Sequence, residues 1–89
     1  MAALAVRVAP GIWVPVETLA EASLAVRQHI DGYGLGSSTW GQAVAPVRDD
    51  AGRVVALVSY NGRVWTTERN WKKRTEIVGE ALHAQEDVR

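Results

Sequence analysis

The dipeptide Asn61-Gly62 constrains the fold of this chain more than any other feature. It separates two β-rich runs, RVVALVSY before it and RVWTT after it. Asn-Gly is favoured at the two central positions of a type I′ turn, because both positions need a positive φ and the twist of the turn matches that of the flanking strands. We therefore predict a β-hairpin with a two-residue loop that places Ser59 opposite Val64.

A second turn is expected at residues 49–52, where DDAG lies between the β-rich runs QAVAPVR and RVVALVSY. A four-residue hairpin loop there would place Val47 opposite Val54. The two hairpins together form a three-stranded antiparallel meander over residues 42–67. Because side chains alternate between the faces of a sheet, one face would carry Val54, Ala56, Val58, Tyr60 and Trp65, and the other Val55, Leu57, Ser59, Val64 and Thr66.

Two helices are expected to flank this meander. The segment from Thr18 to Glu21 is a capping box, in which the Thr18 hydroxyl accepts from the Glu21 amide and the Glu21 carboxylate reaches back. Apolar residues follow it at helical spacing, and Asp31-Gly32 is expected to end this first helix. The second helix is predicted from about Asn70 to Ala84, with an apolar stripe formed by Trp71, Thr75, Val78 and Leu82.

The remaining segments complete a single α+β domain that spans residues 1–89. Residues 1–17 are expected to form an N-terminal strand or arm, in which Pro15 favours an edge position because proline lacks a backbone N–H. Residues 32–42 contain four glycines and are expected to be a connector that Trp40 pins to the core. Residues 85–89 are expected to be a frayed tail. The predicted architecture is helix, three-stranded antiparallel meander, helix.

The composition is that of a folded globular protein, with 47% hydrophobic and 22% charged residues. The absence of cysteine excludes disulfides and thiolate metal sites and favours a cytoplasmic protein. The N-terminal segment lacks the basic and long apolar regions of a signal peptide. No apolar run approaches the roughly 18 to 20 residues needed to cross a bilayer, so we expect no membrane association.

Residues suited to catalysis or metal binding are sparse and scattered. His29 and His83 lie outside any motif that would place a nucleophile and an acid beside them. Asp49 and Asp50 show no repeated ligand spacing, and their role in a turn explains them. The glycine-rich loop at 32–42 follows a helix, whereas phosphate-binding loops follow a strand and open a helix. We predict a protein that is not an enzyme and that holds no cofactor or metal.

Positive charge is concentrated in one segment of a chain whose formal net charge is zero. Residues 53–74 carry a net charge of +5, while residues 1–52 carry −2 and residues 75–89 carry −3. Cations at the start of the predicted last helix would oppose its dipole, so their presence there suggests an anionic partner. The alternative is that neighbouring glutamates, among them Glu76, neutralise them. The candidate binding residues are Tyr60, Arg63, Arg69, Lys72, Lys73 and Arg74.

Two resemblances follow from these features. The helix, three strands and helix expected over residues 18–84 are similar in order to the double-stranded-RNA-binding domain, which also carries lysines at the start of its last helix. This resemblance implies that Lys72 and Lys73 would contact nucleic acid. The Gly-Pro-x-His loop and Lys-Lys-x-Ala-Lys helix start of that family read DDAG and KKRTE in this chain.

The segments GSSTW at 36–40 and VSYNGRVW at 58–65 resemble a family of short uncharacterised bacterial and phage-borne proteins. This second resemblance implies no reaction. Small α+β chains from mobile elements often act by occluding a host machine, as anti-CRISPR inhibitors do, and the resemblance implies such a role here.

Two functions are compatible with the sequence. The first is a non-enzymatic binding protein that occludes a host protein or ribonucleoprotein complex through a sheet face or the hairpin tip at Tyr60 and Arg63, as a mobile-element inhibitor or accessory factor. The second is a nucleic-acid-binding module that uses the basic candidate residues. A homodimer is compatible with both, because Val55, Leu57 and Val64 would form an exposed apolar patch unless another segment covers them.

Overall fold

The computed structural model describes residues 4–36, 38–67 and 71–82. They form an antiparallel sheet with the strand order β2-β1-β3-β4-β5-β6. The elements are β1 (Leu4–Ala9), β2 (Ile12–Val16), α1 (Leu19–Tyr33), β3 (Val44–Asp49), β4 (Val54–Ser59), β5 (Val64–Trp65), the 3-10 turn η1 (Trp71–Lys73), β6 (Glu76–Ile77) and the 3-10 turn η2 (Gly79–Leu82). The predicted α+β class is confirmed, but the sheet has six strands rather than three.

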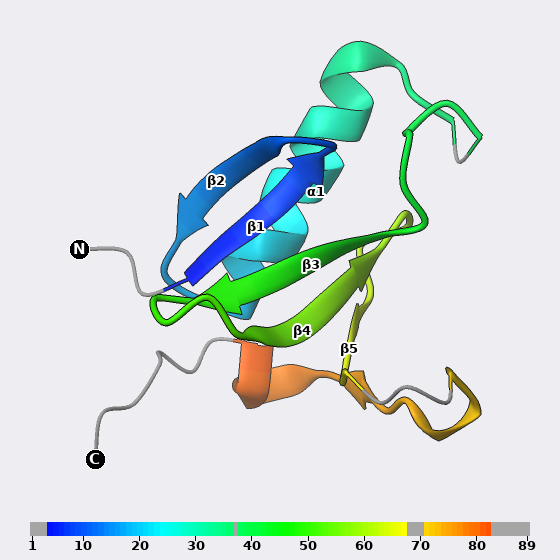
Figure 1. Ribbon diagram of the computed structural model, residues 1–89. Coiled ribbons are helices and arrows are strands. Elements are labelled where there is room, and N and C mark those ends of the chain that lie inside the picture. The colour runs from blue at the N-terminus through cyan, green and yellow to red at the C-terminus, as the bar shows by residue number, and fades with distance from the viewer. Residues whose placement is uncertain (1–3, 37, 68–70, 83–89) are drawn as a thin grey trace.

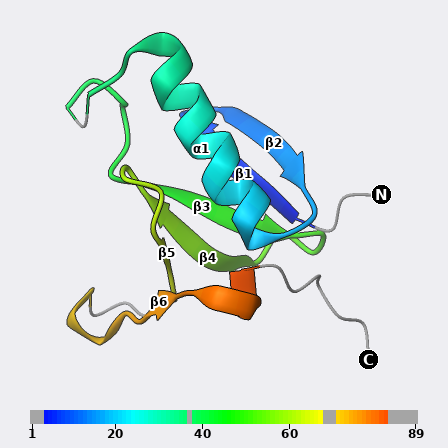
Figure 2. The ribbon, with the colours of Figure 1, turned by 180° about the vertical axis from the view of Figure 1, so that it is seen from behind.

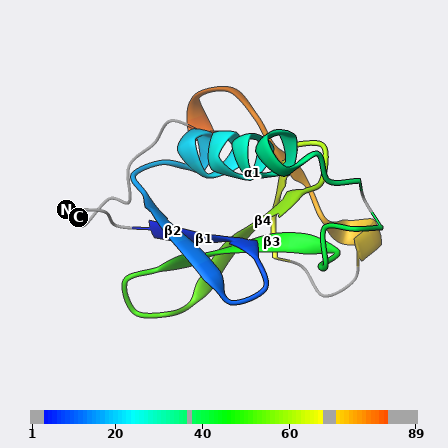
Figure 3. The same ribbon diagram turned by 90° about the horizontal axis from the view of Figure 1, so that it is seen from above.

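The molecule has two layers, the sheet and the helix that covers one of its faces. Figures 2 and 3 show α1 lying across the sheet, where it buries Ala22, Val26 and Ile30. Figure 1 looks onto the opposite face, which no helix of the described residues covers. The core between the layers consists of Leu4, Val6, Val8, Val16, Ala22, Val26, Ile30, Trp40, Ala45, Val47, Ala56, Val58 and Val64. Burial of each Val, Leu or Ile stabilises the fold by about 1.5 to 3 kcal/mol.

The N-terminal segment is a hairpin that belongs to the sheet, rather than a lone strand or an arm. β1 lies between β2 and β3, so that Val6 has Val14 on one side and Val47 on the other. Val6 is fully buried, as expected for a strand with neighbours on both sides. Pro15 lies on β2 at the edge of the sheet, so its predicted edge position is confirmed.

The start of α1 agrees with the predicted capping box in one of its two bonds. The Thr18 hydroxyl accepts from the Glu21 amide over 3.1 Å, but the Glu21 carboxylate accepts from the Glu17 amide over 2.9 Å rather than from Thr18. The predicted end at Asp31-Gly32 is wrong, because α1 continues to Tyr33. Gly34 is the residue that ends it, with φ +64° and its N–H donating to the Asp31 carbonyl oxygen.

The β4–β5 hairpin is confirmed, but its predicted register is wrong by one residue. The loop contains three residues, Tyr60 to Gly62, and the Ser59 amide donates to the Arg63 carbonyl oxygen over 2.8 Å. Gly62 has φ +87°, as in a type I turn followed by a left-handed bulge residue. Val64 therefore lies opposite Val58 rather than opposite Ser59.

This one-residue difference exchanges the faces of two side chains, because the period of a strand is two. Val64 is 2% exposed and packs in the core beside Val58. Trp65 lies opposite Leu57 and is half-buried on the face that α1 does not cover. The large indole ring therefore lies at the surface, whereas the predicted register places Trp65 on the same face as Val58.

The β3–β4 hairpin also has a three-residue loop, since the Asp49 amide donates to the Arg53 carbonyl oxygen over 2.9 Å and Gly52 has φ +86°. Val47 lies opposite Ala56 instead of Val54, so the predicted register is wrong by two residues. A shift of two preserves the faces, and Val47 and Ala56 are both fully buried in the core.

The second predicted helix, from about Asn70 to Ala84, is wrong over the described residues 71–82. This segment forms η1, β6 and η2 instead. Within its expected apolar stripe, Val78 is 61% exposed, whereas Leu82 packs against the core. Residue 70, residues 83 and 84, and the predicted tail at 85–89 lie outside the described residues.

Pairing with β5 explains why the segment after η1 is extended. The Thr66 amide donates to the Thr75 carbonyl oxygen over 3.0 Å, and the Thr75 amide donates to the Thr66 hydroxyl over 3.0 Å. Ile77 then lies opposite Val64 and packs against the core. These contacts satisfy backbone groups that a helix would have used for its own bonds.

Candidate functional site

The sheet face that α1 leaves uncovered is the main candidate surface, and we call it the open face (Figure 1). It carries the side chains that alternate with core positions, such as Leu57 between the buried Ala56 and Val58. Cross-strand pairing places Trp65 and Pro46 on either side of Leu57. The open face comprises Ala5, Arg7, Trp13, Pro15, Val44, Pro46, Arg48, Leu57, Ser59, Trp65 and Glu76.

At the β2 end of the open face, a tryptophan stacks with an arginine. The Arg48 guanidinium lies 4.0 Å from the centroid of the Trp13 ring. Arg7, the strand partner of Trp13, donates from Nε to the Gln42 side-chain oxygen over 3.0 Å, and the Gln42 amide donates back to the Arg7 carbonyl oxygen over 2.8 Å. Arginines held in this way are pre-organised, so less conformational entropy is lost when they bind an anion.

At the β5 end, two adjoining depressions share Ser59 and Trp65, and we call them together the Trp65 hollow. Their volumes are about 360 Å³ and about 350 Å³. A long hydrogen bond of 3.4 Å from the Trp65 indole Nε1 to the Ser59 hydroxyl orients the ring. The Trp65 hollow is lined by Ala43, Val44, Ser59, Tyr60, Asn61, Arg63, Trp65, Lys72 and Arg74.

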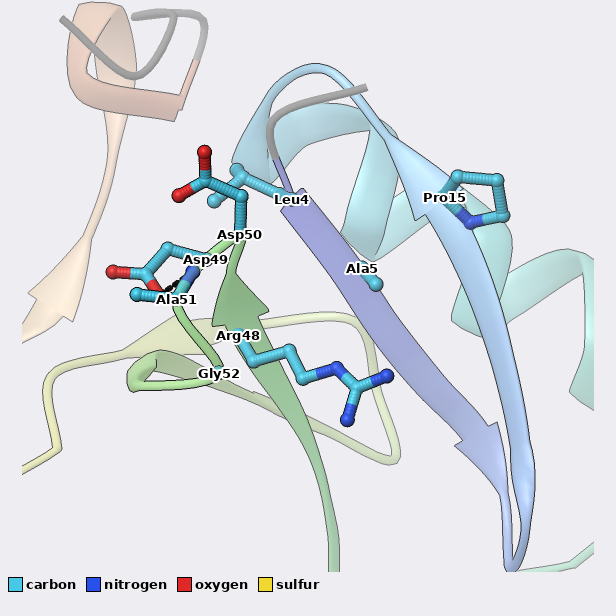
Figure 4. A pocket seen from close by; sticks show the side chains of 8 residues that line it. All are labelled: Leu4, Ala5, Pro15, Arg48, Asp49, Asp50, Ala51 and Gly52. Atoms are coloured by element: carbon cyan, nitrogen blue, oxygen red, sulfur yellow. Dashed lines mark hydrogen bonds between the residues drawn. The ribbon is translucent and has the colours of Figure 1, made fainter. Parts of the chain in front are cut away.

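A third depression, of about 460 Å³, lies beside the β3–β4 loop and is shown in Figure 4. Its lining includes Ala5 and Pro15 from the N-terminal hairpin. The Arg48 side chain extends from β3 toward that hairpin, whereas the Asp50 carboxylate points away from it (Figure 4). This depression is therefore continuous with the Trp13–Arg48 end of the open face.

Asp49, which also lines this depression, has a structural role. Its side chain is 2% exposed, and its carboxylate accepts from the Arg53 amide over 2.9 Å and from the Ala51 amide over 3.0 Å. The Arg53 guanidinium completes an ion pair at 3.1 Å. The pKa of Asp49 is lowered, chiefly because the Arg53 amide donates to the charged form, although burial opposes this effect. The negative charge of Asp49 is thus paired within the β3–β4 loop, which its hydrogen bonds stabilise.

The structure brings together three of the predicted basic residues, but for a different reason from the one expected. Arg63, Lys72 and Arg74 line the Trp65 hollow. Lys73 is exposed and lies outside that lining, and Arg69 lies outside the described residues. The prediction that these cations oppose a helix dipole is wrong, because residues 71–73 form a single 3-10 turn rather than the start of an α-helix. The lysines used for the comparison with double-stranded-RNA-binding domains lie on this turn.

Tyr60 lines the Trp65 hollow but is also tied to the rest of the fold. Its hydroxyl donates to the Leu35 carbonyl oxygen over 2.8 Å, and its ring meets the edge of Trp40 at 6.1 Å. Arg27 donates from its guanidinium to the Tyr60 carbonyl oxygen over 2.7 Å and lies 5.5 Å from the ring centroid. The hairpin tip is therefore anchored to α1 through Arg27.

Charge is divided between the two faces of the molecule. Acidic side chains at and on α1 are Glu17, Glu21 and Asp31, of which Asp31 is paired with Arg27 on the same helix. On the open face and its depressions, basic residues outnumber acidic ones: Arg7, Arg48, Arg63, Lys72 and Arg74 against Asp49, Asp50 and Glu76, of which Asp49 is ion-paired with Arg53. A protein with no net charge can therefore attract an anionic partner to one face.

The described residues offer little that resembles a catalytic or metal site. No group of three His, Cys, Asp or Glu among them could hold a metal ion. His29 lies beside Tyr33 on α1 with tilted rings whose centroids are 4.8 Å apart, and His83 lies outside the described residues. In the glycine-rich loop, the Gly36 amide donates to the Thr39 hydroxyl over 2.7 Å instead of pointing at a ligand site.

Trp40 anchors that loop as predicted. Its side chain is 3% exposed and its Nε1 donates to the Val8 carbonyl oxygen over 2.7 Å. The glycine-rich segment is therefore a connector pinned to the core at the described residues around Trp40.

Sequence reasoning missed the Trp13–Arg48 pair and Arg7. Their partnership depends on β1 lying between β2 and β3, which no local pattern reports. The usable signal was the position of Trp13 next to Val14, which packs against the core, on a proline-containing edge run.

Comparison with known proteins gives no match to a family model, to a curated protein or to a solved structure. Within the described part of the chain, α1 and the short 3-10 turns are the only helical elements, and none is long and apolar enough to span a membrane.

Proposed function

We propose that this protein is a non-enzymatic binding protein that contacts another macromolecule through the open face. The observation that carries the proposal is the presence of Trp13, Trp65 and Arg48 on a sheet face that no described helix covers. The solvent-facing side of an antiparallel sheet is ordinarily polar. Tryptophan and arginine are the residues that most often dominate the binding free energy at interfaces, so their presence here supports a contact surface.

The first candidate partner is a host protein or ribonucleoprotein complex, which the protein would occlude as an inhibitor or accessory factor. The apolar centre of the open face, formed by Val44, Pro46 and Leu57, supports this candidate, because the core of a protein interface is apolar and its rim is polar. The mobile-element setting and the anti-CRISPR-like role come from the sequence resemblance alone and stay predictions. A cytoplasmic location and a homodimer also stay predictions.

The second candidate partner is nucleic acid. The observation that favours it is the Trp65 hollow, where an indole ring lies between Arg63 on one side and Lys72 and Arg74 on the other. Aromatic rings combined with basic side chains are the common elements of surfaces that bind single strands.

Affinity capture from a host lysate tests the proposed function if open-face variants are compared with matched variants on α1. Trp65→Ala removes an apolar ring from the open face, and Leu24→Ala is its control on the exposed side of α1, where Leu24 is 56% exposed. Arg48→Gln and Gln28→Glu each lower the net charge by one, on the open face and on α1 respectively.

We expect the open-face variants to lose the partners that the wild-type protein captures and the α1 variants to retain them. Circular dichroism of each variant checks that the fold is intact. Equal capture by all four variants would show that the open face is not the contact surface.

A further inference from the structure

We infer that the open face binds single-stranded nucleic acid, with a base stacked on Trp65 and phosphates placed on the basic residues around it. This inference rests on the proposed function, because it names the partner of the same surface. Three observations carry it: the position of the Trp65 ring, the distribution of charge over the molecule, and the width of the sheet.

The Trp65 hollow has the shape and lining that a nucleobase requires. Trp65 is half-buried and lines both depressions of the hollow, so part of its ring is available for stacking. Asn61 lies in the same lining, where its side-chain oxygen accepts from the Ser59 hydroxyl and its NH2 group can donate to the edge of a base. Volumes of about 360 Å³ and about 350 Å³ leave room for one or two stacked bases beside the ring.

Phosphate-binding groups lie at both ends of the open face. Arg63 borders the Trp65 hollow, and Arg48 lies over Trp13 at the opposite end. Trp13 and Trp65 are on β2 and β5, four strand spacings apart, which corresponds to roughly 19 Å. A single-stranded oligonucleotide of several residues that crosses the sheet would therefore meet an aromatic ring and an arginine at each end of the open face.

The shape of the surface favours a single strand over a duplex. The six strands form a face roughly 24 Å wide, whereas the major groove of B-DNA is about 12 Å wide and admits one helix or a two-stranded ribbon. The exposed side of α1, which is narrow enough for a groove, carries Glu21, and the charge of Asp31 there is paired with Arg27. Broad sheets with exposed aromatic residues bind unpaired bases by stacking.

The experiment is a fluorescence-anisotropy titration of a labelled oligothymidylate and a labelled oligouridylate, each of about 15 nucleotides, at low salt and at roughly fourfold higher salt. We expect binding whose log-log salt slope is about −2 to −3, as for three or four phosphate contacts on a single strand. Trp65→Ala should weaken binding about 5- to 150-fold, the range found for loss of one base–aromatic stack.

The charge variants separate stacking from general attraction. Arg63→Gln and Arg48→Gln should each weaken binding and lower the salt slope by about 0.7, whereas Gln28→Glu, which makes the same change in net charge on α1, should do neither. These substitutions lie at exposed positions, so they keep the test valid even if Trp65→Ala fails to fold.

Three results would overturn the inference. The first is the absence of oligonucleotide binding at low salt. The second is a duplex of the same length that binds as tightly as the single strands. The third is equally tight binding of polyglutamate that Trp65→Ala does not weaken. That result would indicate an acidic protein as the partner of the open face. In each case, loss of lysate capture by the open-face variants would leave the proposed function standing, so the two claims can fail separately.

Discussion

Two glycines in similar turns provide a quantitative test of how the hairpin tip is anchored. Gly52 and Gly62 occupy the same position in the two three-residue loops, with φ values of +86° and +87°. A Cβ added at Gly52 would meet nothing within 4 Å. A Cβ added at Gly62 would lie 3.1 Å from Cγ and 3.2 Å from Cδ of Arg27, and 3.3 Å from the Ser23 hydroxyl oxygen.

The two alanine substitutions should therefore have different costs. A side chain in the left-handed region costs about 1 to 2 kcal/mol, and Gly52→Ala should lower the free energy of unfolding by about that amount. Gly62→Ala carries the same backbone cost and also displaces Arg27, which donates to the Tyr60 carbonyl oxygen. Loss of a hydrogen bond from a charged group costs about 1.5 to 3 kcal/mol, and Arg27 can retain part of it, so we expect a total of about 2 to 4 kcal/mol.

Urea denaturation followed by tryptophan fluorescence and by circular dichroism measures both costs in one assay. Repeating it in an Arg27→Ala background should reduce the difference between the two glycine variants, because the crowded side chain is gone. Equal costs for Gly52→Ala and Gly62→Ala would refute the anchoring of the tip by α1, whereas a difference that persists without Arg27 would assign the crowding to Ser23, which also lies on α1.

Three further predictions concern the fold. Thr18→Ala should lower the free energy of unfolding by about 1 kcal/mol through loss of the helix cap, as measured by urea denaturation against Thr18→Ser as a control. Trp40→Phe should cost about 1 to 3 kcal/mol, because the Val8 carbonyl oxygen loses its buried donor; a cost near zero would show that water replaces it. Since the pKa of Asp49 is lowered in the folded state, its contribution to stability is complete above its unfolded pKa of about 4 and is lost as the pH falls through the folded pKa. Asp49→Asn should flatten the acid limb of a stability–pH curve, and an unchanged limb would contradict this account.

Features that depend only on residues close together in the sequence could be predicted. The capping residue Thr18 and the two hairpins were predicted because a hydroxyl, a glycine or an Asn-Gly pair acts within a few residues. The register of the β4–β5 hairpin could not be predicted in this way. Gly62 accommodates both a two-residue and a three-residue loop, and the choice depends on burying Val64 beneath α1 and on the contacts of Arg27.

The C-terminal segment shows the same limit. Its apolar residues recur at helical spacing, yet hydrogen bonds between Thr66 and Thr75 direct the chain into the short strand β6 between two 3-10 turns. For a related reason, only part of the candidate site could be predicted from the sequence. Arg63 and Lys72 could be identified as cations near the β5 hairpin, but the pairing of Trp13 with Arg48 joins segments that only the strand order brings together.

The indole N–H signals in a proton–nitrogen correlation spectrum test the open face most directly. During titration with oligothymidylate, the Trp65 and Trp13 signals should shift, while the signal of Trp40, whose N–H is bonded to Val8 beneath the sheet, should stay in place. Backbone signals of Leu57 should move with them. If residues on the exposed side of α1, such as Leu24, shift while Trp65 and Leu57 do not, the open face is not the binding surface.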